Sequence, residues 1–176
     1  MRRSCRFLVA ACSAAALAIV PAASAAPGST NFTVGLAEYA FTSTVGCFAG
    51  KGHGNAGDSA LADTCIEHDR LGSRPTYITG GWFAMTTRSP SGAIDYVSGS
   101  YIYHGGTVTT INPGPNCTNQ QYGINGALEH VATSNTSGGS GTFAGTLTHY
   151  RTRVFGRCVT YWARVRAGVT FAYQTP

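Results

Sequence analysis

The last segment of the chain alternates apolar and polar side chains over residues 158–173. This alternation is the pattern of a β-strand, because successive side chains of a strand point to opposite faces. One face would carry Val159, Tyr161, Ala163, Val165, Ala167, Val169, Phe171 and Tyr173, which we expect in the core. The other face would carry Thr160, Trp162, Arg164, Arg166 and Thr170, and should meet solvent, a ligand or another layer. A strand of this length needs partner strands, so the pattern predicts a sheet protein.

The rest of the chain also favours strands joined by turns. Glycine, threonine and aromatic residues are frequent, and long segments with helical periodicity are missing. Residues 142–153 alternate in the same way, and a turn at 154–156 would join them to the last strand as a long antiparallel hairpin. Further strands are predicted at residues 31–45, 76–87, 94–104, 107–111 and 122–131. We therefore predict a single all-β domain, either an antiparallel β-barrel of the calycin-like type or a β-sandwich.

The N-terminal residues have the features of a secretory signal peptide. Arginines at positions 2, 3 and 6 precede an apolar run over residues 7–20, and small residues follow at 23–25. We expect residues 1–25 to be removed and residues 26–176 to form the secreted domain, in an extracellular or periplasmic location. The alanine-rich signal segment suggests a bacterial exporter. No second apolar segment is long enough to cross a membrane, so no membrane span is expected.

Removal of the signal peptide leaves four cysteines: Cys47, Cys65, Cys117 and Cys158. An even number in an exported chain indicates two disulfides, and four cysteines allow three pairings. We favour the nearest neighbours, Cys47 with Cys65 and Cys117 with Cys158. The first pair would staple an N-terminal excursion at residues 47–74, with a glycine-rich loop at 49–58 and one or two helical turns at 59–68. The second pair would tie a loop to the base of the last strand.

The charge of the secreted part is nearly balanced. Three of the twelve basic residues lie in the signal peptide, which leaves nine against seven acidic residues. Bulk charge therefore indicates no nucleic-acid partner. The distribution is less even, because no Asp or Glu follows Glu129 while five arginines do. One end of the secreted domain should be locally basic.

Several short motifs fail in their context. Gly52–Gly57 fits the dinucleotide fingerprint as a string, but that motif requires a βαβ unit around it. A serine hydrolase built on Asp58 and Ser59 would need a histidine with a carboxylate to orient it, and no such pair is present at the expected offset. The polar cluster at residues 65–70 would need distant partners to hold a metal. We therefore expect no cofactor and no metal.

Two groups of side chains are candidates for ligand binding. His149, Arg151 and Arg153 continue the face that begins with Phe143 and Leu147, so this face passes from apolar to cationic. Inside a barrel, the cationic end would sit at the mouth and could receive an anionic ligand. The alternative, which we favour, is that the strand leaves the core there and enters solvent. The second group is Trp162, Arg164 and Arg166 on the opposite face of the last strand, which could stack on a sugar or an aromatic group or pack beneath a loop.

A short segment resembles a known family of barrels. Residues 137–148 (Ser-Gly-Gly-Ser-Gly-Thr-Phe-Ala-Gly-Thr-Leu-Thr) resemble the Gly-Gly-x-Gly-x-Phe hairpin of dirigent and allene-oxide-cyclase-like proteins. The resemblance implies an eight-stranded antiparallel barrel with the aromatic residue packed inside. It carries over no catalytic residue, and the glycine-rich excursion and the disulfides depart from the family pattern.

We expect from these features a non-enzymatic exported protein that binds a small or surface ligand, because no acid, base and nucleophile are assembled in the sequence. The first alternative is a barrel enzyme of the cyclase or isomerase type, with His149, Glu129 and Tyr101 or Tyr103 as proton-transfer groups. The second alternative is a secreted toxin or host-interaction factor that acts through the basic hairpin. Nothing in the sequence indicates an oligomeric state.

Overall fold

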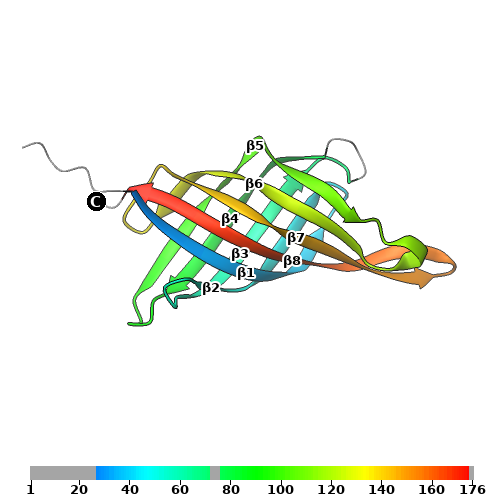
Figure 1. Ribbon diagram of the computed structural model, residues 1–176, viewed down its shortest axis with the longest axis horizontal. Coiled ribbons are helices and arrows are strands. Elements are labelled where there is room, and N and C mark those ends of the chain that lie inside the picture. The colour runs from blue at the N-terminus through cyan, green and yellow to red at the C-terminus, as the bar shows by residue number, and fades with distance from the viewer. Residues whose placement is uncertain (1–26, 72–75, 175–176) are drawn as a thin grey trace, which may run out of the picture.

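The computed structural model describes residues 27–71 and 76–174, and the predicted signal peptide lies outside these ranges. The chain forms one closed barrel of antiparallel strands in sequence order, with β1 paired to β8 (Figure 1). The elements are β1 Pro27–Phe41, β2 Val45–Gly54, β3 Ser59–His68, β4 Tyr77–Arg88, β5 Ile94–Asn112, the 3-10 helix η1 Pro115–Cys117, β6 Gln120–Thr133, β7 Gly139–Val154 and β8 Arg157–Gln174. The prediction of an antiparallel barrel is confirmed, in preference to the sandwich. No helix within the described ranges is long and apolar enough to cross a membrane.

The core fills the inside of the barrel. Inward positions of the strands carry most of its buried side chains, among them Phe32, Phe83, Tyr101, Phe143 and Phe171. Several of these rings touch: Phe83 stacks on Phe171 with centroids 5.4 Å apart, and Tyr101 meets Phe143 edge-on at 5.2 Å. An eight-stranded barrel is just wide enough for side chains to fill. A cavity of about 40 Å³ lies among these central side chains.

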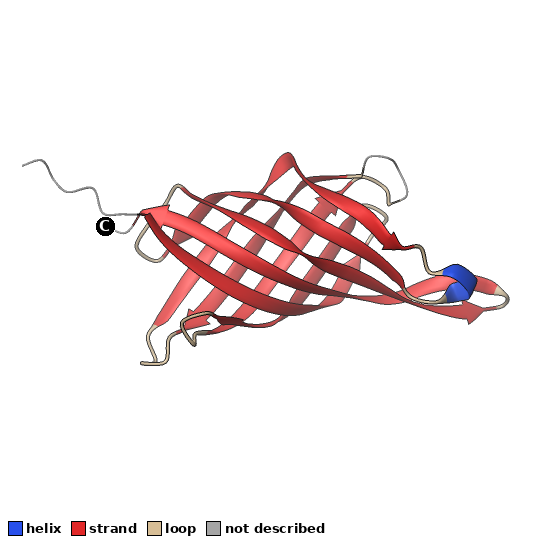
Figure 2. Cartoon of the chain, in the orientation of Figure 1, coloured by secondary structure: helices blue, strands red, loops and turns tan. Residues whose placement is uncertain are grey.

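The excursion predicted at residues 47–74 is in fact largely the β2–β3 hairpin, without the expected helical turns (Figure 2). The inward side of β3 alternates from Ala60 through Thr64 to Ile66, all of which are buried. Small residues fit here because neighbouring backbones lie very close: a Cβ on Gly50 would overlap the carbonyl oxygen of Gly35. Glycine in a strand marks such close approaches as well as loops, so the loop interpretation was wrong.

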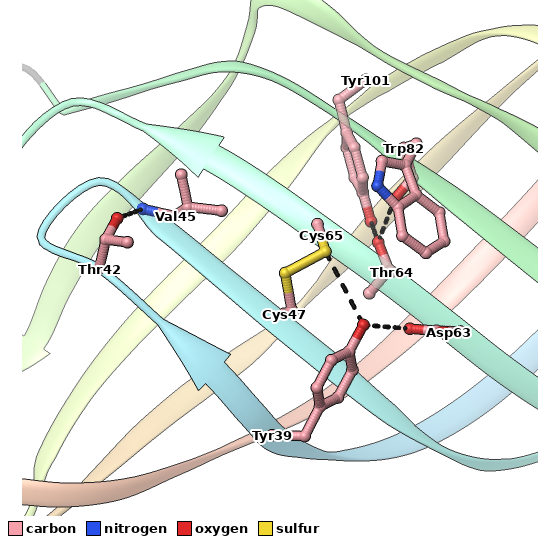
Figure 3. The surroundings of a disulfide bond; sticks show 9 residues. All are labelled: Tyr39, Thr42, Val45, Cys47, Asp63, Thr64, Cys65, Trp82 and Tyr101. Carbon is pink, nitrogen blue, oxygen red and sulfur yellow. Dashed lines mark hydrogen bonds between the residues drawn. A yellow bond between two sulfur atoms is a disulfide. The ribbon is translucent and has the colours of Figure 1, made fainter.

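Both predicted disulfides are present. Cys47 and Cys65 face each other across β2 and β3 with Cα atoms 4.0 Å apart, so this bond staples two strands instead of a loop (Figure 3). Cys117 in η1 is bonded to Cys158 near the start of β8, as the sequence predicted.

The last strand is buried over only part of its length. Ala163, Val165 and Ala167 are buried as predicted, whereas Val159 is 38% exposed and Tyr161 is 59% exposed. These two residues lie where β7 and β8 continue past the rim of the barrel, and the register between the two strands also shifts next to Tyr150. The expected core position of Val159 and Tyr161 is therefore wrong, because no other strand covers that stretch.

The strands predicted at residues 94–104 and 107–111 are one element, β5. Its pairing with β6 is interrupted between Tyr101 and Gly106, and His104 there has a φ of 56°. Such a bulge bends a strand and tightens its twist. β5 therefore changes direction without ending.

Candidate functional site

One end of the barrel holds a cavity of about 270 Å³, which we call the cup. The β1–β2, β3–β4 and β7–β8 connections lie at this end (Figure 1). The floor of the cup is apolar and includes Phe48, Ile66, Ile78, Val108, Ile124 and Leu147. The barrel is thus packed in its middle and hollow at one mouth, which is a common place for a ligand in barrels of this size.

The rim of the cup carries three titratable side chains from three strands. Glu38 on β1, His68 on β3 and His149 on β7 all line it and are all half-buried. Each follows an inward apolar residue two positions earlier, Leu36, Ile66 and Leu147 respectively, so each lies at the point where its strand leaves the core. The fold therefore brings the three groups to the same mouth.

His149 meets the ring of Tyr122 edge-on, with centroids 5.3 Å apart. Burial lowers the pKa of His149 below its ordinary value of 6.5, and electrostatic interactions with His68 and Arg151 act in the same direction. The imidazole is consequently neutral at pH 7. A neutral imidazole offers one hydrogen-bond donor and one acceptor, so His149 can bind a hydroxyl or carbonyl group without placing a charge in the cup.

His68 and Glu38 complete the rim. The Nδ1 atom of His68 lies 2.7 Å from the carbonyl oxygen of Asp69, and because a carbonyl oxygen can only accept, Nδ1 is the donor of this hydrogen bond. Burial raises the pKa of Glu38, while a hydrogen bond from the backbone N–H of Ala163 acts in the opposite direction. The rim can therefore donate to and accept from a polar group above an apolar floor.

The two arginines predicted beside His149 lie elsewhere. Arg151 donates from Nη1 to the carbonyl oxygen of Gly114, at 3.1 Å, in the connection between β5 and β6. Arg153 is exposed and lies farther along β7. Neither side chain lines the cup as the structure describes it. Binding of an anionic ligand by Arg151 and Arg153 stays a prediction, separate from the cup.

The second predicted group lies on the outer wall of the barrel. Trp162 stacks on Tyr150 of the neighbouring strand, with ring centroids 4.8 Å apart. Arg164 is half-buried and Arg166 is exposed. The stacking gives Trp162 a packing role, and a ligand on this face stays a prediction.

The candidate proton-transfer groups of the enzyme alternative are not brought together. Tyr101 is buried at the centre of the barrel, where its hydroxyl lies 2.7 Å from Oγ1 of Thr64 (Figure 3). Tyr103 is 68% exposed. The side chain of Glu129 is 44% exposed, with Oε1 3.9 Å from Nδ1 of His130. Neither Tyr101, Tyr103 nor Glu129 lines the cup with His149.

No group of three or more His, Cys, Asp or Glu side chains in the described ranges is arranged to hold a metal ion. The polar cluster at residues 65–70 is divided between different surroundings. Cys65 is in a disulfide, while Arg70 and His68 line the cup. The cluster therefore contributes two polar side chains, His68 and Arg70, to the rim of the cup.

Sequence reasoning found His149 but missed Glu38, His68 and Thr160 of the same rim. A signal for the first two was present. The inward series of β1 ends in Glu38 and that of β3 ends in His68, just as the series of β7 ends in His149. The prediction of helical turns at residues 59–68 conceals the second of these parallels, because it places His68 off the strand pattern.

The comparisons with known proteins give the chain no relative. Neither the protein-family models, nor the curated proteins, nor the solved structures contain a match to it. The barrel agrees with the fold that the resemblance to dirigent and allene-oxide-cyclase-like proteins implies, and membership of that family stays a prediction.

Proposed function

We propose that the chain is an exported binding protein that holds a small, mainly apolar molecule in the cup. The observation that carries this proposal is the combination of an apolar floor with Glu38, His68 and His149 at the rim. Pockets that bind small molecules are typically apolar with a few polar groups that fix orientation. The two disulfides support export, because such bonds persist in oxidising compartments.

The cup favours a compact ligand with one polar end. Its volume of about 270 Å³ lies near the lower limit of ligand pockets, roughly 300–1,000 Å³. His149 is neutral at pH 7 and burial raises the pKa of Glu38, so the rim favours hydrogen bonding over strong charge pairing. Arg70 also lines the cup. We therefore expect an apolar body with a hydroxyl or carboxyl end group.

The test uses the neutral fluorescent probe N-phenyl-1-naphthylamine, displaced by octan-1-ol or by octanoic acid. The variant Leu147→Trp fills the floor of the cup, and Leu61→Trp adds the same ring at an exposed position of the outer wall. We expect wild type and Leu61→Trp to bind the probe, and Leu147→Trp to lose binding while its circular dichroism stays that of a barrel. Absence of binding to wild type, or equal binding by both variants, would refute the proposal.

The enzyme alternative has one observation in its favour. Burial raises the pKa of Glu38 and lowers that of His149, and both line the same cup. Side chains whose pKa values are shifted in this way are suited to proton transfer, although burial in a purely structural setting produces the same pKa shifts. A displaced ligand recovered chemically unchanged after long incubation supports the binding protein. Conversion that stops in His149→Ala would instead support an isomerase.

A further inference from the structure

The ends of β7 and β8 run past the rim of the barrel as a two-stranded arm, which we define as residues 151–160. The strands stay paired as far as Val154 and Arg157, which flank a two-residue turn at Phe155 and Gly156. Every residue from 152 to 159 is exposed. Figure 1 shows the arm projecting beyond the other connections at this end, with η1 beside it. The arm contributes little to the core and presents its tip to the surroundings.

The arm is attached to the β5–β6 connection both at its base and close to its tip. Cys158 is bonded to Cys117 of η1. The backbone N–H of Arg151 donates to Oδ1 of Asn119 at 3.3 Å, and its guanidinium donates to the carbonyl oxygen of Gly114. A segment ordered in advance loses less conformational entropy when it binds. The tip is therefore held as a preorganised surface.

The tip carries an apolar side chain that folding does not require. Phe155 is 101% exposed and has a φ of 48°, followed by Gly156 at 77°. A two-residue hairpin turn with both φ values positive favours Asn, Asp or Gly at its first position. Phenylalanine is strained in this conformation and buries nothing here. An exposed aromatic ring on a residue with an unfavourable backbone conformation indicates that Phe155 serves in binding and not in folding.

The apolar tip is flanked by positive charge. Arg153 and Arg157 are exposed, and no ion pair joins either of them within the described part of the chain. No acidic residue follows Glu129 in the sequence, so nothing on the arm itself offsets these charges. Cationic side chains around an apolar one match a surface with anionic groups over a hydrocarbon layer.

We propose that the tip of the arm binds membranes that contain anionic lipids, with Phe155 in the interface and Arg153 and Arg157 at the phosphate groups. A convex tip with one large apolar side chain offers far less area than the roughly 1,000 Å² of a stable protein interface. Insertion into a lipid interface needs no such complementary surface. This proposal does not depend on the cup.

The experiment measures co-sedimentation of the oxidised protein with vesicles of phosphatidylglycerol and phosphatidylcholine, and with vesicles of phosphatidylcholine alone. We expect binding to the anionic vesicles only, weakened by salt. Phe155→Ala should lower the partition coefficient about tenfold, from the free energy of burying a phenylalanine side chain. Arg153→Gln and Arg157→Gln should each lower it about fivefold. Leu61→Ala, which removes an exposed apolar side chain of the outer wall, is the matched control and should bind as wild type does.

Phe155→Asn separates a role in binding from a role in folding. Asparagine suits the turn, so this variant should melt at a temperature equal to or above that of wild type and still lose vesicle binding. Unchanged binding by Phe155→Asn, equal binding to neutral vesicles, or no binding by wild type would each overturn the proposal. The last of these results, together with a protein partner captured only when Phe155 is present, would favour the host-interaction function instead.

Discussion

Replacement of Thr64 by valine should destabilise the barrel more than replacement of its partner Tyr101 by phenylalanine. Oγ1 of Thr64 donates to the carbonyl oxygen of Trp82 at 2.7 Å, and the hydroxyl of Tyr101 lies 2.7 Å from the same Oγ1. Threonine has a single hydroxyl proton, so Tyr101 must be the donor to Thr64. The three groups form a chain of hydrogen bonds from the centre of the core to the wall of the barrel.

The magnitude follows from which polar group is left without a partner. Tyr101→Phe removes one donor while Thr64 keeps its bond to Trp82, which should cost about 0.5–1.5 kcal/mol of unfolding free energy. Thr64→Val removes both bonds and leaves the buried tyrosine hydroxyl unsatisfied, which should cost about 2–3 kcal/mol. The double variant buries no orphan hydroxyl and should cost only about 1 kcal/mol. The coupling between the two sites is then about 2.5 kcal/mol.

Urea unfolding of the four oxidised proteins, followed by tryptophan fluorescence and circular dichroism together, measures this cycle. The linear extrapolation gives the free energy of unfolding for each protein. Effects that add to within about 0.5 kcal/mol would show that the hydroxyl of Tyr101 finds another partner when Thr64 is lost, and would refute the reasoning.

Three further measurements test the burial of Tyr101, a close approach of two backbones and the second disulfide. Burial raises the pKa of Tyr101 from 10.0 to about 12, so its contribution is complete below pH 10 and is lost between pH 10 and 12. Over that range wild type should lose about 2–3 kcal/mol more than Tyr101→Phe in urea unfolding, and parallel losses would contradict the burial. Gly145→Ala would push a Cβ into the backbone carbonyl of the facing strand and should cost about 1–3 kcal/mol, whereas at Gly168 the nearest atom is 4.0 Å away and alanine should be tolerated; equal melting temperatures would contradict the close approach. Replacing Cys117 and Cys158 by serine opens a loop of 41 residues and should lower stability by about 4 kcal/mol, and an unchanged urea midpoint would contradict a role in the fold.

The alternation of apolar and polar residues predicted most of the barrel, because a strand with one buried face carries apolar side chains at every second position. It worked well for Ala163, Val165 and Ala167, which face a complete ring of neighbouring strands. It failed at Val159 and Tyr161, since alternation persists in a hairpin that has left the barrel. Alternation shows that two faces differ and does not show that one of them is covered.

The β2–β3 hairpin was missed because the low strand propensity of its residues obscures the alternation between its two faces. Gly50 and Gly52 have a low propensity for strands. Ala60 is small, so it contributes little to the alternation of apolar and polar residues by which a strand is identified. These small side chains are placed where backbones approach closely, which only the assembled barrel reveals. The cup depends on this hairpin, so the helical interpretation of residues 59–68 separated His68 from His149.

Pairing of β1 with β8 gives the fold a late final step. The hydrogen bond from Thr170 to Asn31 joins residues 139 positions apart, and the strands on either side of it form the seam that closes the ring. Contacts so distant along the chain make folding slow, because the entropy of closing the loop must be overcome before the seam stabilises anything. A chain that emerges N-terminus first must keep the edge of β1 unpaired until the last strand is released. Any truncation within β8 would leave two open edges, and with them a route to aggregation.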